Sequence, residues 1–157
     1  MEFDDLVELL RALESAKVRC AVVGAVALNF HGLARATADI DLFVSPDEEN
    51  IERLKAALKS IFSDPEIEGI CYEDFAGAYP TIQYVPPSGT YHIDILARLG
   101  EAFSFEDIET QEMELEGVRV RVATPRMLYR MKKDTVRIQD RADAERLRKR
   151  FNLEPED

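Results

Sequence analysis

Residues 21–44 read AVVGAVALNFHGLARATADIDLFV, and this stretch decides the fold. An apolar run ends at Gly24, and a second apolar run carries Asp39 and Asp41. Side chains two residues apart in a strand point to the same face, so these two carboxylates project side by side. Moving an ionised carboxylate away from water costs several kcal/mol unless something pairs with it. A hydrogen-bonded structural role and a divalent cation both remain open as the partner.

Gly24 stands where the first apolar run gives way to a helical pattern. Free backbone N–H groups at the start of a helix favour an anion, and glycine lets that anion approach closely. A triphosphate resting on Gly24 and Ala25 would bring its metal toward Asp39 and Asp41. A tight turn between strand and helix explains the same glycine equally well.

The stretch YHIDILARL, residues 91–99, repeats the pattern because Asp94 lies between two isoleucines. If this strand neighbours the first, Asp39, Asp41 and Asp94 converge, and such oxygen ligands suit Mg²⁺ or Mn²⁺. The chain contains thirteen aspartates, so one Asp-x-Asp pair is expected by chance and means little alone. The informative feature is the order of strand, glycine, helix and a further strand that carries the pair.

Composition predicts a cytoplasmic protein with one domain over residues 1–157, made of a core (1–123) and a helical segment (124–152). The acidic start and the short apolar runs argue against secretion and a membrane span. The net charge is −11, yet residues 126–150 hold ten Lys or Arg against four Asp or Glu. This basic segment could contact phosphate or could simply be a solvated helical face.

Periodicity and turn residues predict an α/β fold, with a mixed sheet flanked by helices and two helices at the C-terminal end. Thr124 is expected to cap a helix that opens with Pro125, and Glu116-Gly117 to form a hairpin turn. The expected helices are 3–16, 25–32, 46–62, 125–134 and 138–151. The expected strands are 18–23, 38–44, 67–73, 79–85, 90–97 and the hairpin 112–123.

These motifs together resemble the DNA polymerase β-like nucleotidyltransferase superfamily, through Gly24-Ala25, Asp39-Ile40-Asp41 and Asp94. Within it, residues 21–44 are similar to the small AbiEii-type toxins and minimal nucleotidyltransferases, whose Arg-x-Thr is Arg35-Ala36-Thr37 here. Residues 132–147, KKDTVRIQDRADAERL, are similar to the C-terminal helix signature of that group, through Lys133, Arg137, Asp140 and Asp143.

The resemblance implies a nucleotidyltransferase fold and transfer of a nucleoside monophosphate from an NTP to an acceptor hydroxyl. Asp39, Asp41 and Asp94 would be both the catalytic residues and the ligands of Mg²⁺ or Mn²⁺. The phosphate-binding residues would be Gly24, Ala25, Arg35, Thr37 and Lys132 or Lys133. The superfamily usually has Gly-Gly or Gly-Ser where this chain has Gly24-Ala25.

The acceptor hydroxyl is left open among RNA such as tRNA, a partner protein and a small molecule. A role in a toxin–antitoxin or phage-defence system is expected from the resemblance. Two alternatives stand beside it: a nucleotide-binding or interaction module with weak or no turnover, and an antitoxin that nucleotidylates its partner toxin.

Four further residues have two interpretations each. His31 is expected to cap a helix end, and a catalytic role is less favoured. His92 shares the strand face of Asp94, and orientation of Asp94 is favoured over direct metal ligation. Asp140 and Asp143 either form ion pairs on a structural helix or belong to the site.

Overall fold

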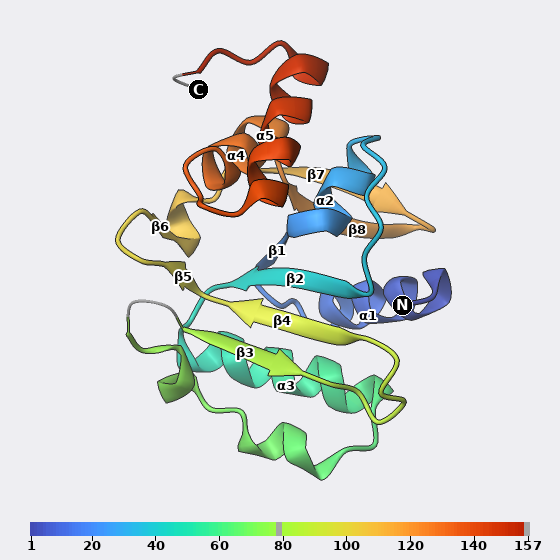
Figure 1. Cartoon of the computed structure of the whole chain (residues 1–157). Coiled ribbons are helices and arrows are strands. Elements are labelled where there is room, and N and C mark those ends of the chain that lie inside the picture. The colour runs from blue at the N-terminus through green and yellow to red at the C-terminus, as the bar shows by residue number, and fades with distance from the viewer. Residues whose placement is uncertain (78–79, 156–157) are drawn as a thin grey trace.

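A six-stranded mixed sheet forms the centre of the protein, in the order β3-β4-β2-β1-β8-β7 (Figure 1). The computed structural model describes residues 1–77 and 80–155. Strands β2 and β4 are parallel, as are β1 and β8, while the three other pairings are antiparallel. The sheet strands are β1 (Cys20–Val23), β2 (Asp39–Val44), β3 (Thr81–Tyr84), β4 (His92–Leu96), β7 (Thr110–Leu115) and β8 (Val118–Ala123).

Helices cover both faces of this sheet (Figure 1). Helices α1 (Phe3–Ser15) and α3 (Glu48–Ile61) pack against each other on one face. Helices α2 (Gly24–Phe30), α4 (Pro125–Lys132) and α5 (Ile138–Phe151) lie on the other. The α/β architecture, the mixed sheet and the two C-terminal helices expected from the sequence are therefore confirmed.

Local sequence signals explain where several elements begin. The Thr124 hydroxyl accepts a hydrogen bond from the Met127 N–H at 3.1 Å, and Pro125 opens α4, as expected for a capped helix. Asp47 caps α3 in the same way through the Asn50 N–H. Glu116 and Gly117 both have positive φ, which suits the tight turn of the β7–β8 hairpin.

The strand predicted over residues 67–73 is wrong. Two 3₁₀ helices, η1 (Pro65–Gly69) and η2 (Tyr72–Phe75), occupy this part of the chain. The Asp64 side chain caps η1 by accepting from the Glu66 N–H. Ile67 and Ile70 are both buried and three residues apart, which fits the period of a 3₁₀ helix, whereas a strand would turn them to opposite faces.

The strand expected over residues 79–85 is observed as β3, and residue 79 lies outside the described residues. A small two-stranded sheet, β5 (Arg98–Leu99) with β6 (Phe103–Ser104), and a 3₁₀ turn, η3 (Phe105–Asp107), were not expected. No helix in the described part of the chain combines the length and apolar character that a membrane crossing needs.

Candidate active site

The parallel register of β2 and β4 brings the predicted acidic residues together. Asp41 lies opposite Asp94 and Asp39 lies opposite His92, and the side chains of paired residues share one face of the sheet. The three carboxylates converge from two neighbouring strands, as the sequence predicts for adjacent strands. All three line one open cavity of about 540 Å³.

The same cavity collects most of the residues expected to bind phosphate. Its wall includes the start of α2, the loop before β2 and the end of α4. The expected site residues found in this wall are Gly24, Ala25, Arg35, Thr37 and Lys132. Met131, Thr135, Arg137 and Asp140 also line it; of these, the sequence had singled out only Arg137 and Asp140, through the C-terminal signature.

Gly24 and Asp41 are in direct contact. Gly24 has φ +69°, a left-handed conformation that favours glycine, and a Cβ there would overlap the Asp41 carboxylate. Glycine at this position therefore does more than close a turn, because it leaves room for a carboxylate at the foot of the cavity.

The pKa of Asp41 is raised to about 6. Burial is the largest cause, followed by the nearby Asp94, which repels the ionised form and shares a hydrogen bond, and then by Asp39. Lys132 acts in the opposite direction but is outweighed. Carboxylates gathered this closely are stabilised in their ionised form by a cation.

The His92 imidazole lies closer to Asp39 than to Asp94. Its Nε2 lies 2.9 Å from Asp39 Oδ2 and 3.5 Å from Asp94 Oδ2. The Gln83 amide on β3 donates to Asp94 Oδ1 at 3.4 Å. Asp94 therefore has Gln83 and His92 as neighbours. The sequence did not predict the contact with Gln83, because this contact depends on the β3–β4 register.

The described residues contain a compact group that could hold a metal ion, namely Asp39, His92 and Asp94. One ligand atom from each residue lies within 4.8 Å of the other two. The buried Asp39 Oδ1 has no hydrogen-bond partner within the described ranges, which leaves an acceptor suited to a cation. The sequence expected Asp41 in this group, whereas the compact set has His92 in its place.

Arg35 and Lys132 are joined through a buried carboxylate. Asp143, whose side chain is 0% exposed, lies 3.4 Å from Arg35 Nε and 3.4 Å from Lys132 Nζ. Lys132 also contacts Asp140 at 3.2 Å, and Thr135 donates to the same carboxylate. Asp140 and Asp143 thus form ion pairs with cations of the cavity wall, which combines both interpretations of these residues.

Lys133 and Thr37 have contacts of another kind. The Lys133 ammonium donates to the Pro155 carbonyl at 2.8 Å and lies over the Tyr129 ring. The Thr37 hydroxyl lies 3.1 Å from both the N–H and the carbonyl oxygen of Asp39, so it holds the entry to β2. His31 ends α2, and its Nε2 lies 2.8 Å from the Ala123 carbonyl, consistent with a structural role.

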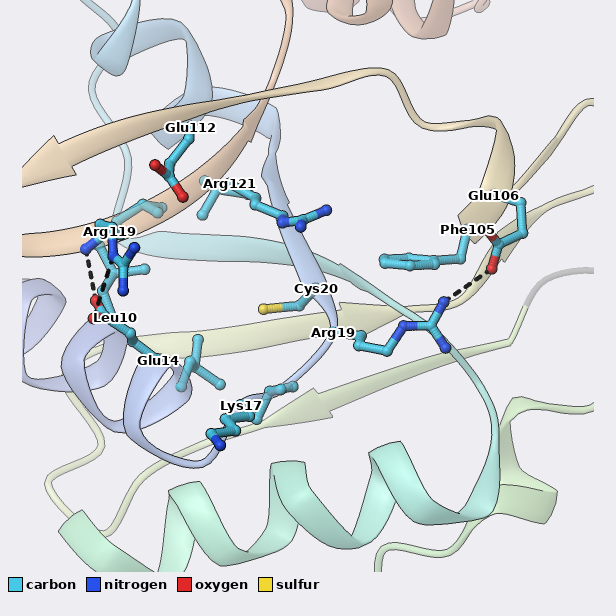
Figure 2. A pocket seen from close by; sticks show the side chains of 14 residues that line it. Leu10, Glu14, Lys17, Arg19, Cys20, Phe105, Glu106, Glu112, Arg119 and Arg121 are labelled. Carbon is cyan, nitrogen blue, oxygen red and sulfur yellow. Dashed lines mark hydrogen bonds and ion pairs between the residues drawn. The ribbon is translucent and has the colours of Figure 1, made fainter.

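A second cavity, of about 490 Å³, lies on the other side of the sheet and is not lined by any of the three aspartates (Figure 2). Cys20 points into this cavity. It shares the strand face of Val22, which is opposite to the face of Val23 and its cross-strand partner Asp41. Burial raises the pKa of the Cys20 thiol to about 12, which favours its protonated form. Arg19 is paired with Glu106 at 3.2 Å, so part of the charge in this cavity is already neutralised.

The comparison with protein families decides where this chain belongs. Residues 8–150 match the family model described as nucleotidyl transferase AbiEii toxin, type IV TA system. The chain belongs to the AbiEii family. The match includes the cavity and the acidic cluster, and it confirms the resemblance found in the sequence. No curated protein sequence matches the chain.

Solved structures support the fold of this AbiEii chain. A Thermotoga maritima protein described as a nucleotidyltransferase has a TM-score of 0.61 at 18% identity, covering 95% of this chain and 91% of its own. ANT(2″)-Ia, solved in complex with adenylyl-2″-tobramycin, has a TM-score of 0.58 at 13% identity, with coverage of 94% and 88%. A nucleotidyltransferase-like protein of Paracoccidioides brasiliensis reaches 0.52 at 17% identity, with coverage of 91% and 73%. At these identities the likeness establishes the nucleotidyltransferase fold alone.

Proposed function

We propose that this chain transfers a nucleoside monophosphate from an NTP to an acceptor hydroxyl, with Mg²⁺ or Mn²⁺ held by its acidic cluster. The observation that carries the proposal is the pairing of Asp41 with Asp94 across two parallel strands, in a cavity that also contains Gly24 and Lys132. Carboxylates and cations in one cavity suit a substrate that combines phosphates with a metal.

The residues fit a divalent cation for two reasons. Asp39 keeps a buried carboxylate oxygen without a partner among the described residues. The pKa of Asp41 is raised first by burial and then by repulsion from Asp94 and Asp39, and a cation would offset both effects. A bound divalent cation would neutralise charge on the triphosphate and make an acceptor hydroxyl a better nucleophile.

At the α-phosphorus, the reaction forms one bond and breaks one. The acceptor oxygen bonds to the α-phosphorus, and the bond from that phosphorus to the bridging oxygen breaks, so that pyrophosphate leaves. Asp94 orients the hydroxyl and takes its proton, a role open to a carboxylate within reach of the attacking oxygen. Its contacts with Gln83 and His92 hold it toward the cavity.

Charge in the cavity wall would stabilise the triphosphate. Arg35 and Lys132 both reach the cavity, and Asp143 holds the two cations in fixed positions. Gly24 and Ala25 contribute backbone N–H groups from the first turn of α2. Thr37 positions Asp39, and Lys132 rather than Lys133 is the lysine that we assign to phosphate binding.

The acceptor is proposed to be RNA such as tRNA, a partner protein or a small molecule. A net charge of −11 disfavours a broad nucleic-acid surface, while the basic stretch 126–150 allows a local contact with phosphate. The toxin description of the family supports a role in a toxin–antitoxin system. A nucleotide-binding module without turnover and an antitoxin acting on its partner toxin are the alternatives.

Transfer of label from α-³²P NTPs tests the proposal. Each NTP is incubated with Mg²⁺ or Mn²⁺ and with total RNA, cell protein or small hydroxyl compounds. We expect label on one acceptor class with the wild type and none with Asp94→Asn. Asp4→Asn, which changes an exposed carboxylate of α1, is the matched control and should transfer normally.

The outcomes separate the candidate functions. Label on RNA supports the toxin role, and label on a single partner protein supports the antitoxin role. NTP binding without pyrophosphate release under every metal and acceptor would replace the enzyme with the binding module. Equal transfer by wild type and Asp94→Asn would contradict the proposed site.

A further inference from the structure

The third member of the compact metal-binding group is a histidine rather than a carboxylate. His92 enters because the β2–β4 register sets it opposite Asp39, while Asp94 follows two residues later on the same face. Its Nε2 is directed at both carboxylates, at 2.9 and 3.5 Å. A cation shared by Asp39 and Asp94 would therefore have an imidazole nitrogen beside it.

We propose that His92 is a direct nitrogen ligand of the metal and that the site therefore selects Mn²⁺ over Mg²⁺. This inference rests on the proposed function, since it concerns the metal of the same site. It differs from the sequence-based interpretation, which favoured orientation of Asp94 over direct ligation by His92.

A hydrogen bond between His92 and Asp39 does not account for the whole cluster. His92 reaches Asp39 Oδ2, and the buried Oδ1 of the same carboxylate is left without a partner among residues 1–77 and 80–155. A buried acceptor without a partner is costly unless a cation or water meets it. One metal bound by Asp39, Asp94 and His92 would satisfy the carboxylates and use the imidazole nitrogen.

The donor set determines the metal preference. Mg²⁺ strongly favours oxygen ligands and near-ideal octahedral geometry, and an imidazole is a poor replacement for one of its oxygens. Later divalent metals accept imidazole nitrogen more readily, and their affinity for mixed nitrogen and oxygen sites rises from Mn²⁺ to Co²⁺. A site with one nitrogen and two carboxylates should thus prefer Mn²⁺, and Co²⁺ still more.

Pulsed electron paramagnetic resonance of bound Mn²⁺ tests the ligand directly, without any catalytic turnover. Inorganic tripolyphosphate serves as the phosphate probe because it contains no nitrogen. The protein is prepared with ¹⁵N-histidine and natural-abundance nitrogen elsewhere. The chain has only two histidines, His31 and His92, so His31→Gln is the matched control for His92→Gln.

We expect ¹⁵N coupling to Mn²⁺ in the wild type and in His31→Gln, and its loss in His92→Gln. In parallel, the Mn²⁺ dissociation constant should rise at least about tenfold in His92→Gln, whereas that for Mg²⁺ should change less than about threefold. Mn²⁺ bound without ¹⁵N coupling in the wild type would overturn ligation by His92. Equal weakening of Mn²⁺ and Mg²⁺ binding would overturn the selectivity.

Failure of this inference and failure of the proposed function are distinguishable. Label transfer that depends on Asp94, together with Mn²⁺ that lacks histidine coupling, refutes the histidine ligand and leaves the enzyme standing. Histidine coupling in a protein that transfers no label to any acceptor supports the ligand and refutes turnover.

Discussion

Gly24 and Asp41 occupy adjoining space, such that a Cβ on residue 24 would lie 2.9 Å from Asp41 Cγ and overlap its carboxylate oxygen. Residue 24 also has φ +69°, which L side chains rarely adopt. The strand-to-helix turn and the position of a proposed metal ligand thus both depend on the absence of a Cβ at residue 24.

Gly24→Ala should therefore displace Asp41 and damage transfer as well as stability. We expect transfer to fall about 100-fold, because a shift of about 1 Å in a reacting group can have that effect. Gly89→Ala is the matched control, since Gly89 has φ +70° and open space where its Cβ would be. Both variants should lose about 1 kcal/mol to backbone strain, and only Gly24→Ala should lose activity. Similar transfer rates in the two variants would show that Asp41 does not need this space.

The raised pKa of Asp41 predicts a pH-dependent penalty in the metal-free protein. Its pKa rises from 3.8 in the unfolded chain to about 6 in the fold, so folding favours the neutral carboxyl. The contribution of Asp41 to the free energy of unfolding is fully present below the pKa of the unfolded chain, and it is lost as the pH rises through the folded pKa of about 6. Asp41→Asn should remove this dependence, and in EDTA its advantage over wild type should grow by about 1–2 kcal/mol between acidic and neutral pH, allowing for solvent screening.

Denaturant unfolding of both proteins across this pH range gives the difference between their free energies of unfolding. Taking this difference cancels the contributions of the titrating groups that the two proteins share. Saturating Mn²⁺ should narrow the gap, because a cation stabilises the ionised carboxylate that Asp41→Asn lacks. A gap that is constant with pH would mean that Asp41 titrates normally in the folded protein.

Much of the site could be predicted because its signals are local in the chain. Asp39 and Asp41 share a face by the period of a strand, and Gly24 precedes a helix by a short-range rule. The convergence with Asp94 needed one further assumption, that the two strands are neighbours, and the register confirms it.

The features that the sequence left open or predicted wrongly depend on long-range register or on local capping. His92 meets Asp39 only because β2 and β4 pair with that offset, and the sequence of either strand alone does not define it. Ile67 and Ile70 are three residues apart, which fits a 3₁₀ helix better than the period of two of a strand, and the Asp64 side chain caps the start of this helix. The choice between Lys132 and Lys133 depends on which face of α4 turns to the cavity near its end.

The adjacent lysines should behave differently when each loses its charge. Lys132 lines the cavity and pairs with Asp140, whereas Lys133 reaches the Pro155 carbonyl. Lys132→Gln should raise KM for the NTP at least about tenfold, as expected for the loss of a charge-assisted contact to phosphate. Lys133→Gln should leave KM within about twofold. Steady-state kinetics at saturating Mn²⁺ would measure both, and a larger effect from Lys133 would transfer the phosphate-binding role to that residue.

The Asp143 carboxylate should contribute to both stability and the ordering of the cavity wall, because it is fully buried between Arg35 and Lys132. Asp143→Asn keeps the shape but removes the charge that two partly buried cations need, so unfolding free energy should fall by about 3 kcal/mol. Glu145→Gln on the same helix breaks an exposed pair with Arg148 and should cost less than about 1 kcal/mol.

Binding of tripolyphosphate to Asp143→Asn tells whether Asp143 acts through its negative charge or by positioning Arg35 and Lys132. If Asp143 orders the two cations, its loss should weaken binding despite the more positive cavity, and tighter binding would show that the carboxylate only competes with phosphate for them.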